Sequence, residues 1–270
     1  MSILLEVKSL AKSYPQRVGF FRTRLFHALN PTSFTLEKAR TLAIMGANGS
    51  GKSTLAALIS GAATPSSGEI LFSGERLIAG DYQQRAKHIR MVFQDADASL
   101  NPHLTIGKQL EEPLLFNTSL NSNQRRERII ATLQQVGLLG EHMVFYPQMM
   151  STGQKQRASI ARAIILKPDI LVADEALATL DSSVRAQIIN LLLDLQSKLG
   201  IAYIFISQSP EIVKHMADEV LIMKDGDVIE RGTVADVFSN PQHDYTQKLL
   251  RSELSNSPIG SKVDIASLEK

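Results

Sequence analysis

The N-terminal third of the chain has the pattern of short strands separated by turns. Brief apolar segments bounded by residues that break regular structure predict strands at residues 4–8, 34–36 and 41–45. The third of these runs into a glycine-rich loop, and a helical pattern follows at residues 53–59. A strand that leads through glycines into a helix is a common way of presenting backbone N–H groups to a ligand.

The middle of the chain changes to a helical pattern. Residues 124–136 place Ile129, Ile130, Leu133 and Val136 on one stripe, with arginines largely off it. Asparagine and serine at 121–123 are suitable caps for that helix. We therefore expect a helical insertion at about residues 100–166.

Strand and helix patterns alternate again after the insertion. Uninterrupted apolar runs at 170–173 and 202–207 are typical of strands buried on both faces of a parallel sheet. The helix expected at 184–199 would connect them by a right-handed crossover. Residues 220–229 predict a hairpin with Asp-Gly in its turn. The sequence thus predicts one domain over residues 1–250 and a polar tail over 251–270.

Composition excludes several classes of protein. The chain has 270 residues, 44% hydrophobic and 21% charged, so it can bury a core. A formal net charge of +2 does not favour a dedicated nucleic-acid binder. The absence of cysteine excludes disulfides, thiolate metal sites and cysteine nucleophiles. No apolar run approaches the roughly 20 residues of a membrane span, and the N-terminus does not resemble a secretory signal. Any membrane association is therefore expected to go through partners.

A phosphate-binding loop carries the strongest chemical signal. The pattern G-x-x-x-x-G-K-[ST] is matched by Gly46, Ala47, Asn48, Gly49, Ser50, Gly51, Lys52 and Ser53, with Thr54 next on the helix. Backbone N–H groups of such a loop surround the α- and β-phosphates, and the helix dipole favours their charge. Lys52 would reach the β- and γ-phosphate oxygens, and the Ser53 hydroxyl would bind Mg²⁺.

Two carboxylates end an apolar strand further along the chain. Asp174 and Glu175 follow the run at 170–173, and ligands of α/β sheets bind at the carboxyl ends of strands. Asp174 is placed to hold Mg²⁺, directly or through water. Glu175 is the candidate to polarise an attacking water.

The ordered set of motifs resembles the nucleotide-binding subunit of an ABC transporter over roughly residues 3–250. The set comprises the phosphate loop, Gln94, the signature-like Met150-Ser151-Thr152-Gly153-Gln154, the acidic strand end and Ala178-Thr179-Leu180-Asp181. The family signature is Leu-Ser-Gly-Gly-Gln, matched here at three of five places. Ser99-Leu100-Asn101-Pro102 and the segment from Asn240 to Thr246 are similar to the family's peptide-importer branch. That branch moves dipeptides and oligopeptides.

The resemblance implies a fold and a set of roles. The fold is α/β, a P-loop (RecA-like) ATPase core with an N-terminal antiparallel β-subdomain and an inserted helical subdomain. ATP and Mg²⁺ are the implied cofactors. Tyr14 would stack on adenine, and Gln94 would contact Mg²⁺ or the lytic water. Ser151, Gly153 and Gln154 would reach the nucleotide of a second subunit, and Asp181 would organise that interface while capping a helix.

Two positions depart from the family pattern. Thr152 occupies a place where the family has glycine, so a β-branched side chain lies where backbone approaches phosphate. Gln208 occupies the place of a histidine that contacts the γ-phosphate, and an amide cannot become cationic. Reduced activity of the isolated chain is therefore expected. A heterodimer with a related ATPase subunit of normal signature and histidine is favoured over a homodimer.

The resemblance also implies the setting of the protein. Two integral membrane permease subunits are the expected partners, and the expected location is the cytoplasmic face of the bacterial inner membrane, as a peripheral subunit. The alternative is a soluble ABC ATPase acting on nucleic acid or the ribosome. The insertion has no sustained heptads, which argues against the alternative. A GTPase would carry Asn-Lys-x-Asp, which is missing, and a P-loop kinase would not explain residues 150–154.

Overall fold

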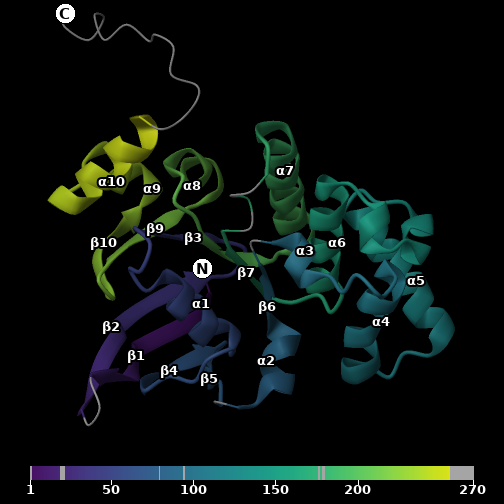
Figure 1. Ribbon diagram of the computed structural model, residues 1–270, viewed down its shortest axis with the longest axis horizontal. Coiled ribbons are helices and arrows are strands. Elements are labelled where there is room, and N and C mark those ends of the chain that lie inside the picture. The colour runs from purple at the N-terminus through teal and green to yellow at the C-terminus, as the bar shows by residue number, and fades with distance from the viewer. Residues whose placement is uncertain are drawn as a thin grey trace, which may run out of the picture.

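The strands of the protein form two sheets that share one interior. The computed structural model describes residues 2–18, 22–78, 80–93, 95–175, 177 and 180–255. One sheet has four strands in the order β2-β1-β4-β5, and the other has six in the order β10-β9-β3-β8-β7-β6 (Figure 1). Helices cover the six-stranded sheet and extend to one side as a separate group (Figure 1). The predicted α/β class is confirmed.

The four-stranded sheet is antiparallel and comes from the N-terminal part of the chain. Its members are β1 (Ile3–Val18), β2 (Arg22–Glu37), β4 (Ser67–Phe72) and β5 (Glu75–Arg76). β1 and β2 are much longer than the strands expected at 4–8 and 34–36. The distal half of β1 is mostly polar and that of β2 mixes polar and apolar residues, so neither gives a clear strand pattern.

The six-stranded sheet forms the centre of the core and is parallel except at one edge. Its members are β3 (Thr41–Met45), β6 (Ile89–Val92), β7 (Ile170–Asp174), β8 (Ala202–Ile206), β9 (Glu219–Lys224) and β10 (Asp227–Thr233). β7 and β8 pair in parallel, as predicted from their apolar runs. Ile204 and Ile206 pack toward the antiparallel sheet, whereas Tyr203 and Phe205 pack toward the helical insertion. Burial on both faces explains why these strands contain no polar alternation.

Helix α1 (Lys52–Ser60) lies between the two sheets. Its Leu55 and Leu58 are fully buried in the cluster that includes Leu5 and Phe34 of the antiparallel sheet. The helix begins directly after the glycine-rich loop and ends at Gly61 in the left-handed conformation. α2 (Tyr82–His88) precedes β6 and is capped by Asp81. These contacts fix the start of α1, and hence the glycine-rich loop, from both sheets.

The helical insertion packs as one group beside the core sheet (Figure 1). Its elements are α3 (Ala96–Ser99), α4 (Ile106–Asn117), α5 (Ser122–Gln135), η1 (Gly140–Val144), η2 (Pro147–Met149) and α6 (Thr152–Ile164). Asn121 caps α5, and Ile129 and Leu133 are buried as their spacing predicts. α7 (Ser182–Leu199) begins after its cap Asp181, whose side chain accepts a hydrogen bond from the N–H of Val184 at 2.9 Å.

The C-terminal helices cover the outer face of β3 and β9. They are α8 (Pro210–Met216), α9 (Val234–Ser239) and α10 (Asp244–Ser255). α10 continues beyond Leu250, where the polar tail was expected to begin, and residues 256–270 lie outside the described part. β9 and β10 form the predicted hairpin. Its turn residue Gly226 is buried, donates to Ser50 O at 3.1 Å and accepts from Asn30 N–H at 2.9 Å. The turn thus joins the glycine-rich loop to β2.

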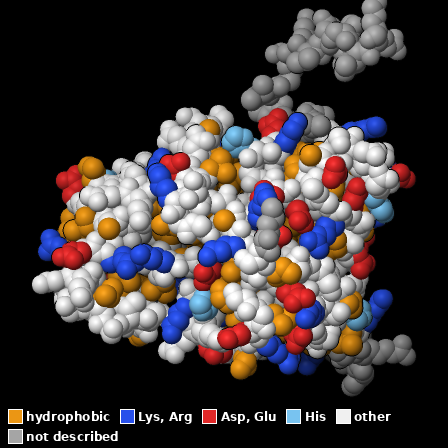
Figure 2. Space-filling view, turned by 180° about the vertical axis from the view of Figure 1, so that it is seen from behind, with side chains coloured by type: hydrophobic (Ala, Val, Ile, Leu, Met, Phe, Trp, Pro, Cys, Tyr) orange, Lys and Arg blue, Asp and Glu red, His pale blue; other side chains and the backbone are white. Residues whose placement is uncertain are grey.

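Within the described residues, no helix is both long and apolar enough to traverse a lipid bilayer. Figure 2 shows basic and acidic side chains interspersed over the face opposite that of Figure 1. Among the residues described on that face they do not merge into a continuous basic strip. This mixture of charges agrees with the formal net charge of +2 of the sequence.

Candidate nucleotide site

The glycine-rich loop takes a conformation that only glycine allows at two positions. Gly46 has a φ of +153°, and a Cβ there would lie 2.2 Å from the carbonyl oxygen of Met223. Gly51 has a φ of +102°, and a Cβ there would lie 2.7 Å from the carbonyl oxygen of Ala28. β9 and β2 therefore press against the two ends of the loop. The loop is held between β3 and α1 as the motif predicts.

Lys52 is buried and turned back over its own loop. Its Nζ donates to the carbonyl oxygens of Gly46 at 2.8 Å and Ala47 at 2.9 Å. Burial lowers the pKa of Lys52, and the nearby carboxylates of Glu175 and Asp174 partly offset that effect. An ammonium group has three N–H donors. Two are used within the loop, so one is left for a phosphate oxygen.

Asp174 ends β7 opposite Ser53 of α1. Burial raises the pKa of Asp174, while a hydrogen bond from the Ser53 hydroxyl and the Lys52 charge act in the opposite direction. Its Oδ1 is buried without a hydrogen-bond partner. A buried carboxylate oxygen without a donor, next to a hydroxyl, is a ligand set of the kind that Mg²⁺ prefers. The two residues therefore fit the predicted role of holding Mg²⁺.

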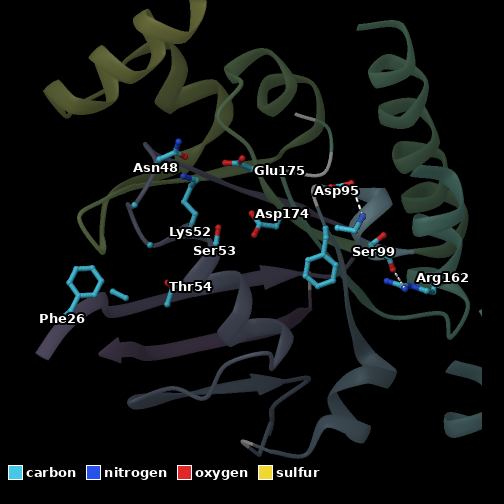
Figure 3. A pocket seen from close by; sticks show the side chains of 15 residues that line it. Phe26, Asn48, Lys52, Ser53, Thr54, Asp95, Ser99, Arg162, Asp174 and Glu175 are labelled. Carbon is cyan, nitrogen blue, oxygen red and sulfur yellow. Dashed lines mark hydrogen bonds between the residues drawn. The ribbon is translucent and has the colours of Figure 1, made fainter. Parts of the chain in front are cut away.

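Glu175 and Gln208 meet across the mouth of the loop. The Gln208 side-chain amide donates to Glu175 Oε1 at 2.7 Å and to Asn48 Oδ1 at 2.9 Å. Glu175 has a φ of +47°, an uncommon backbone conformation for a residue with a side chain, and its N–H donates to Ile206 O at 3.0 Å. The ends of β7 and β8 and the loop thus bring these three side chains together; Figure 3 shows two of them, Asn48 and Glu175.

Asn48 and Glu175 belong to the lining of a cavity of about 800 Å³. Lys52, Ser53, Thr54, Asn48, Asp174 and Glu175 line its polar part (Figure 3). Phe26 and Phe93 add aromatic surface and are about half exposed. A polar cluster beside exposed rings is the arrangement that suits a molecule with phosphates and a flat base.

Tyr14, the residue expected to stack on adenine, is not among the described residues that line the cavity, whereas its neighbour Phe26 is. Tyr14 lies opposite Phe26 in the pairing of β1 with β2, so both rings lie on the same face of that sheet. Phe26 lines the cavity, whereas the ring of Tyr14 lies 4.8 Å from Lys12 Nζ. Phe26 was missed because no motif marks it. Its only signal is an aromatic residue two positions before the buried Ala28.

Around position 94 the structure describes the neighbouring residues Phe93 and Asp95. Gln94 lies outside the described residues, as do Ala178 and Thr179. The neighbours Phe93 and Asp95 both line the cavity. Arg162 of α6 lines it as well, although no motif predicts a role for it there.

The signature-like residues lie at the start of α6, away from the cavity. Ser151 caps the helix: its Oγ accepts from Gln154 N–H at 3.3 Å, and Gln154 Oε1 accepts from Ser151 N–H at 2.9 Å. A Cβ at Gly153 would approach Val184 Cγ1 at 3.3 Å. Among the described residues that line the cavity, none belongs to residues 151–154. Gln154 therefore has a structural role within its own chain.

Comparison with known proteins gives the family. Residues 29–178 match the ABC transporter family. The chain is 50% identical over 247 residues to the putrescine export system ATP-binding protein SapF of Escherichia coli (strain K12), covering 92% of each. It is equally similar, with the same coverage, to the peptide transport system ATP-binding protein SapF of Salmonella typhimurium. A dimeric post-hydrolysis structure of the ATP-binding cassette MJ0796 with ADP and Pi has a TM-score of 0.74, 26% identity, and covers 86% of this chain and 99% of that one.

The fold and the cavity are those of an ABC-type ATPase. The chain belongs to the ABC transporter family, and it is an ATP-hydrolysing subunit of that family.

Proposed function

We propose that this chain powers a membrane transporter for peptides or related small cationic solutes. The observation that carries the ATPase part is the convergence of Lys52, Ser53, Asp174 and Glu175 on one cavity. Support for the solute class comes from the names of its relatives, which refer to peptide transport and to putrescine export. Putrescine is a small cation, so both names are compatible with the proposed class.

The residues of the cavity divide the work of ATP hydrolysis. The free donor of Lys52 and the backbone N–H groups of the loop would bind phosphate oxygens. Ser53 and Asp174 would hold Mg²⁺, which supplies positive charge to the phosphates. Gln94 is proposed to join them or to contact the lytic water. Glu175 would accept a proton from that water, and Gln208 orients the Glu175 carboxylate through its 2.7 Å hydrogen bond. Phe26 and Tyr14 offer flat surfaces for the base.

The signature residues would act on a second subunit. Ser151 and Gly153 start a helix whose N-terminus is free of acidic residues in its first turn, so its dipole is open to an anion. A related ATPase subunit is the proposed second member. In a homodimer both sites would combine Gln208 with Thr152, whereas a heterodimer separates the two departures.

The permease subunits are proposed to dock in a groove beside α3. The groove has a volume of about 550 Å³ and is lined by Asp97, Leu100, Asn101, Pro102, Gln109 and Glu112 among others. Its lining is polar and carries charges of both signs, Asp97 and Glu112 with Arg162, and it suits a short cytoplasmic helix with polar residues. Association with the cytoplasmic face of the inner membrane would follow from this contact, and no nucleic-acid partner is proposed.

The test is recovery of the complex from membranes. A tagged chain should copurify, after detergent extraction, with two integral membrane subunits and a related ATPase. Its ATPase activity in liposomes should rise when a peptide or putrescine is supplied. Crosslinkers placed between Asp95 and Asn101 should reach a membrane subunit. Copurification with ribosomes or DNA and no membrane protein would contradict the proposal.

A further inference from the structure

The C-terminal helix contacts the phosphate loop through one phenol group. The backbone N–H of Ala47 donates a hydrogen bond to the Tyr245 hydroxyl oxygen at 2.9 Å, between residues 198 positions apart. Ala47 lies at the beginning of the loop, and Tyr245 lies in the first turn of α10. None of the described residues that line the nucleotide cavity belongs to α10.

Several contacts fix the position of the Tyr245 ring. It packs on the apolar cluster that contains Ala43 and Met45, the outward-facing residues of the strand that leads into the loop. Lys224 Nζ lies 5.4 Å from the ring centroid, over its face. The Tyr245 N–H donates to the ring of His243 at 3.1 Å. These contacts fix the position of the Tyr245 ring, and with it the position of the hydroxyl that meets the loop.

Glu230 of β10 anchors the chain just before α10. Its carboxylate accepts hydrogen bonds from Gln242 N–H at 2.8 Å and His243 N–H at 3.2 Å. Burial raises the pKa of Glu230, but the hydrogen bonds that its carboxylate accepts outweigh that effect, so its pKa is lowered. The carboxylate is ionised at neutral pH. The first turn of α10 is thus tied to the core sheet independently of the phosphate loop.

The peptide group that joins Gly46 to Ala47 is held from two directions. Its N–H, on Ala47, donates to Tyr245, and its carbonyl oxygen, on Gly46, accepts from Lys52 at 2.8 Å. Lys52 is the same group that offers its remaining donor to phosphate. A shift of the peptide group between Gly46 and Ala47 would change the direction of that donor. Tyr245 therefore influences the phosphate site without lining it.

We propose that Tyr245 is a positioning residue that holds the phosphate loop in its nucleotide-binding conformation. This inference rests on the proposed ATPase site. It assigns to α10 the role of fixing the loop before nucleotide enters, and it concerns affinity and not the chemical step. The phenol contacts neither Glu175 nor Gln208 in the hydrogen bonds of the described residues.

The test is the change Tyr245→Phe, which keeps the ring and removes the acceptor. The dissociation constant for ATP should rise about 3- to 10-fold, because one hydrogen bond on a partly exposed rim is lost and water can partly replace it. KM should rise by the same factor, with kcat within about twofold. The Ala47 amide should exchange its hydrogen about tenfold faster in nucleotide-free protein, measured by NMR.

Tyr82→Phe is the matched control, because Tyr82 is exposed on α2 and the same hydroxyl is removed. It should leave affinity and Ala47 exchange unchanged. Unchanged ATP affinity in Tyr245→Phe would overturn the inference, even if the melting temperature fell, because packing alone would then explain the contact. A fall in kcat with constant KM would also overturn it. Failure of the unmodified chain to bind ATP would instead overturn the proposed function.

Discussion

At the scale of single residues, the candidate site contains buried charged groups that lower the free energy of unfolding when no ligand is bound. Asp174 keeps a buried oxygen without a donor, and Lys52 is buried close to two carboxylates. Such groups lower the stability of the empty protein while they raise the affinity for a charged ligand. This property distinguishes the buried carboxylate of Asp174 from the ion pairs on the described surface.

The change Asp174→Asn should therefore stabilise the ligand-free protein. Burial raises the pKa of Asp174 above the ordinary value of 3.8, so the folded state holds the proton more tightly than the unfolded chain does. This proton-linked stability is complete below the unfolded pKa and is lost as pH rises through the folded pKa. At pH 7 in EDTA the variant should melt about 2–4 °C higher than the unmodified chain.

Thermal melts in EDTA at pH 7 and pH 4 provide the check. The difference should shrink at pH 4, because the raised pKa of Asp174 lets the folded state bind the proton more readily than the unfolded chain does. The stabilisation by Mg²⁺ with ADP should be much smaller in the variant. An Asp174→Asn protein that melts below the unmodified chain at pH 7 would refute the argument.

The change Glu175→Gln should separate binding from turnover. The amide keeps the size of the side chain but cannot take a proton, and loss of an oriented base commonly costs about 10²- to 10⁴-fold in rate. ATP affinity should stay within about twofold, measured by calorimetry, and single-turnover rates should give the loss. Lys52→Ala is the contrasting variant, since it should abolish tight binding. Turnover at the unmodified rate would assign the base to another group.

At the scale of elements, α3 separates the ATP cavity from the proposed permease groove. Ala98, Ser99 and Arg162 line both spaces. α3 has only four residues, and contacts with α6 hold it: the Ser99 hydroxyl lies 3.1 Å from the Ser159 hydroxyl, and Arg162 donates to Ser99 O. α6 begins at the signature residue Ser151. A movement of the signature helix would therefore move α3 with it.

Ser159→Ala should weaken that link without touching the nucleotide. One buried hydrogen bond contributes about 1 kcal/mol, so stimulation of ATPase activity by the permease subunits should fall about fivefold. ATP affinity of the isolated chain should not change. The measurement is ATPase activity with and without permease subunits in liposomes. A stimulation equal to that of the unmodified protein would show that α3 is coupled in another way.

The sequence predicted the elements whose pattern is set by burial or by motif. β3, β7, β8, α5 and α7 agree closely with expectation, because both faces of the strands are buried and the helices carry capped apolar stripes. β1 and β2 were predicted too short, since their distal parts are held by pairing with each other. Contacts between distant residues, such as Gln208 with Asn48, have no local pattern. The sequence indicated Tyr245 only as one residue of the segment from Asn240 to Thr246, which is similar to the peptide-importer branch.

At the scale of the whole molecule, one chain holds half of each expected ATP site. The cavity has Lys52, Asp174 and Glu175, whereas Ser151 and Gly153 lie elsewhere. When the partner subunit is a different chain, the two departures from the family pattern, Thr152 and Gln208, fall on different ATP sites. A hydrogen bond to the charged γ-phosphate contributes about 1–3 kcal/mol. Placing the losses at Thr152 and Gln208 on different ATP sites therefore keeps each site closer to full activity.

The isolated chain should therefore hydrolyse ATP weakly and gain activity from its partner subunit. Gln208→His and Thr152→Gly should raise the activity of the chain alone, and Gln208→His should add a titration near pH 6.5 to the rate profile, which glutamine cannot give. Steady-state ATPase assays of the chain, the variants and the reconstituted pair provide the check. Stable homodimers with full activity would refute the heterodimer.

The buried turn at Gly226 limits how this surface hairpin can diverge. Most hairpin tips accept insertions over evolutionary time because they contact only water. Here Gly226, with a φ of +87°, bonds to Ser50 of the phosphate loop and to Asn30 of β2. One extra residue would break both bonds and displace the loop that Lys52 completes. Among homologous chains, length variation should therefore collect in other connections, such as those around α5, and spare this turn.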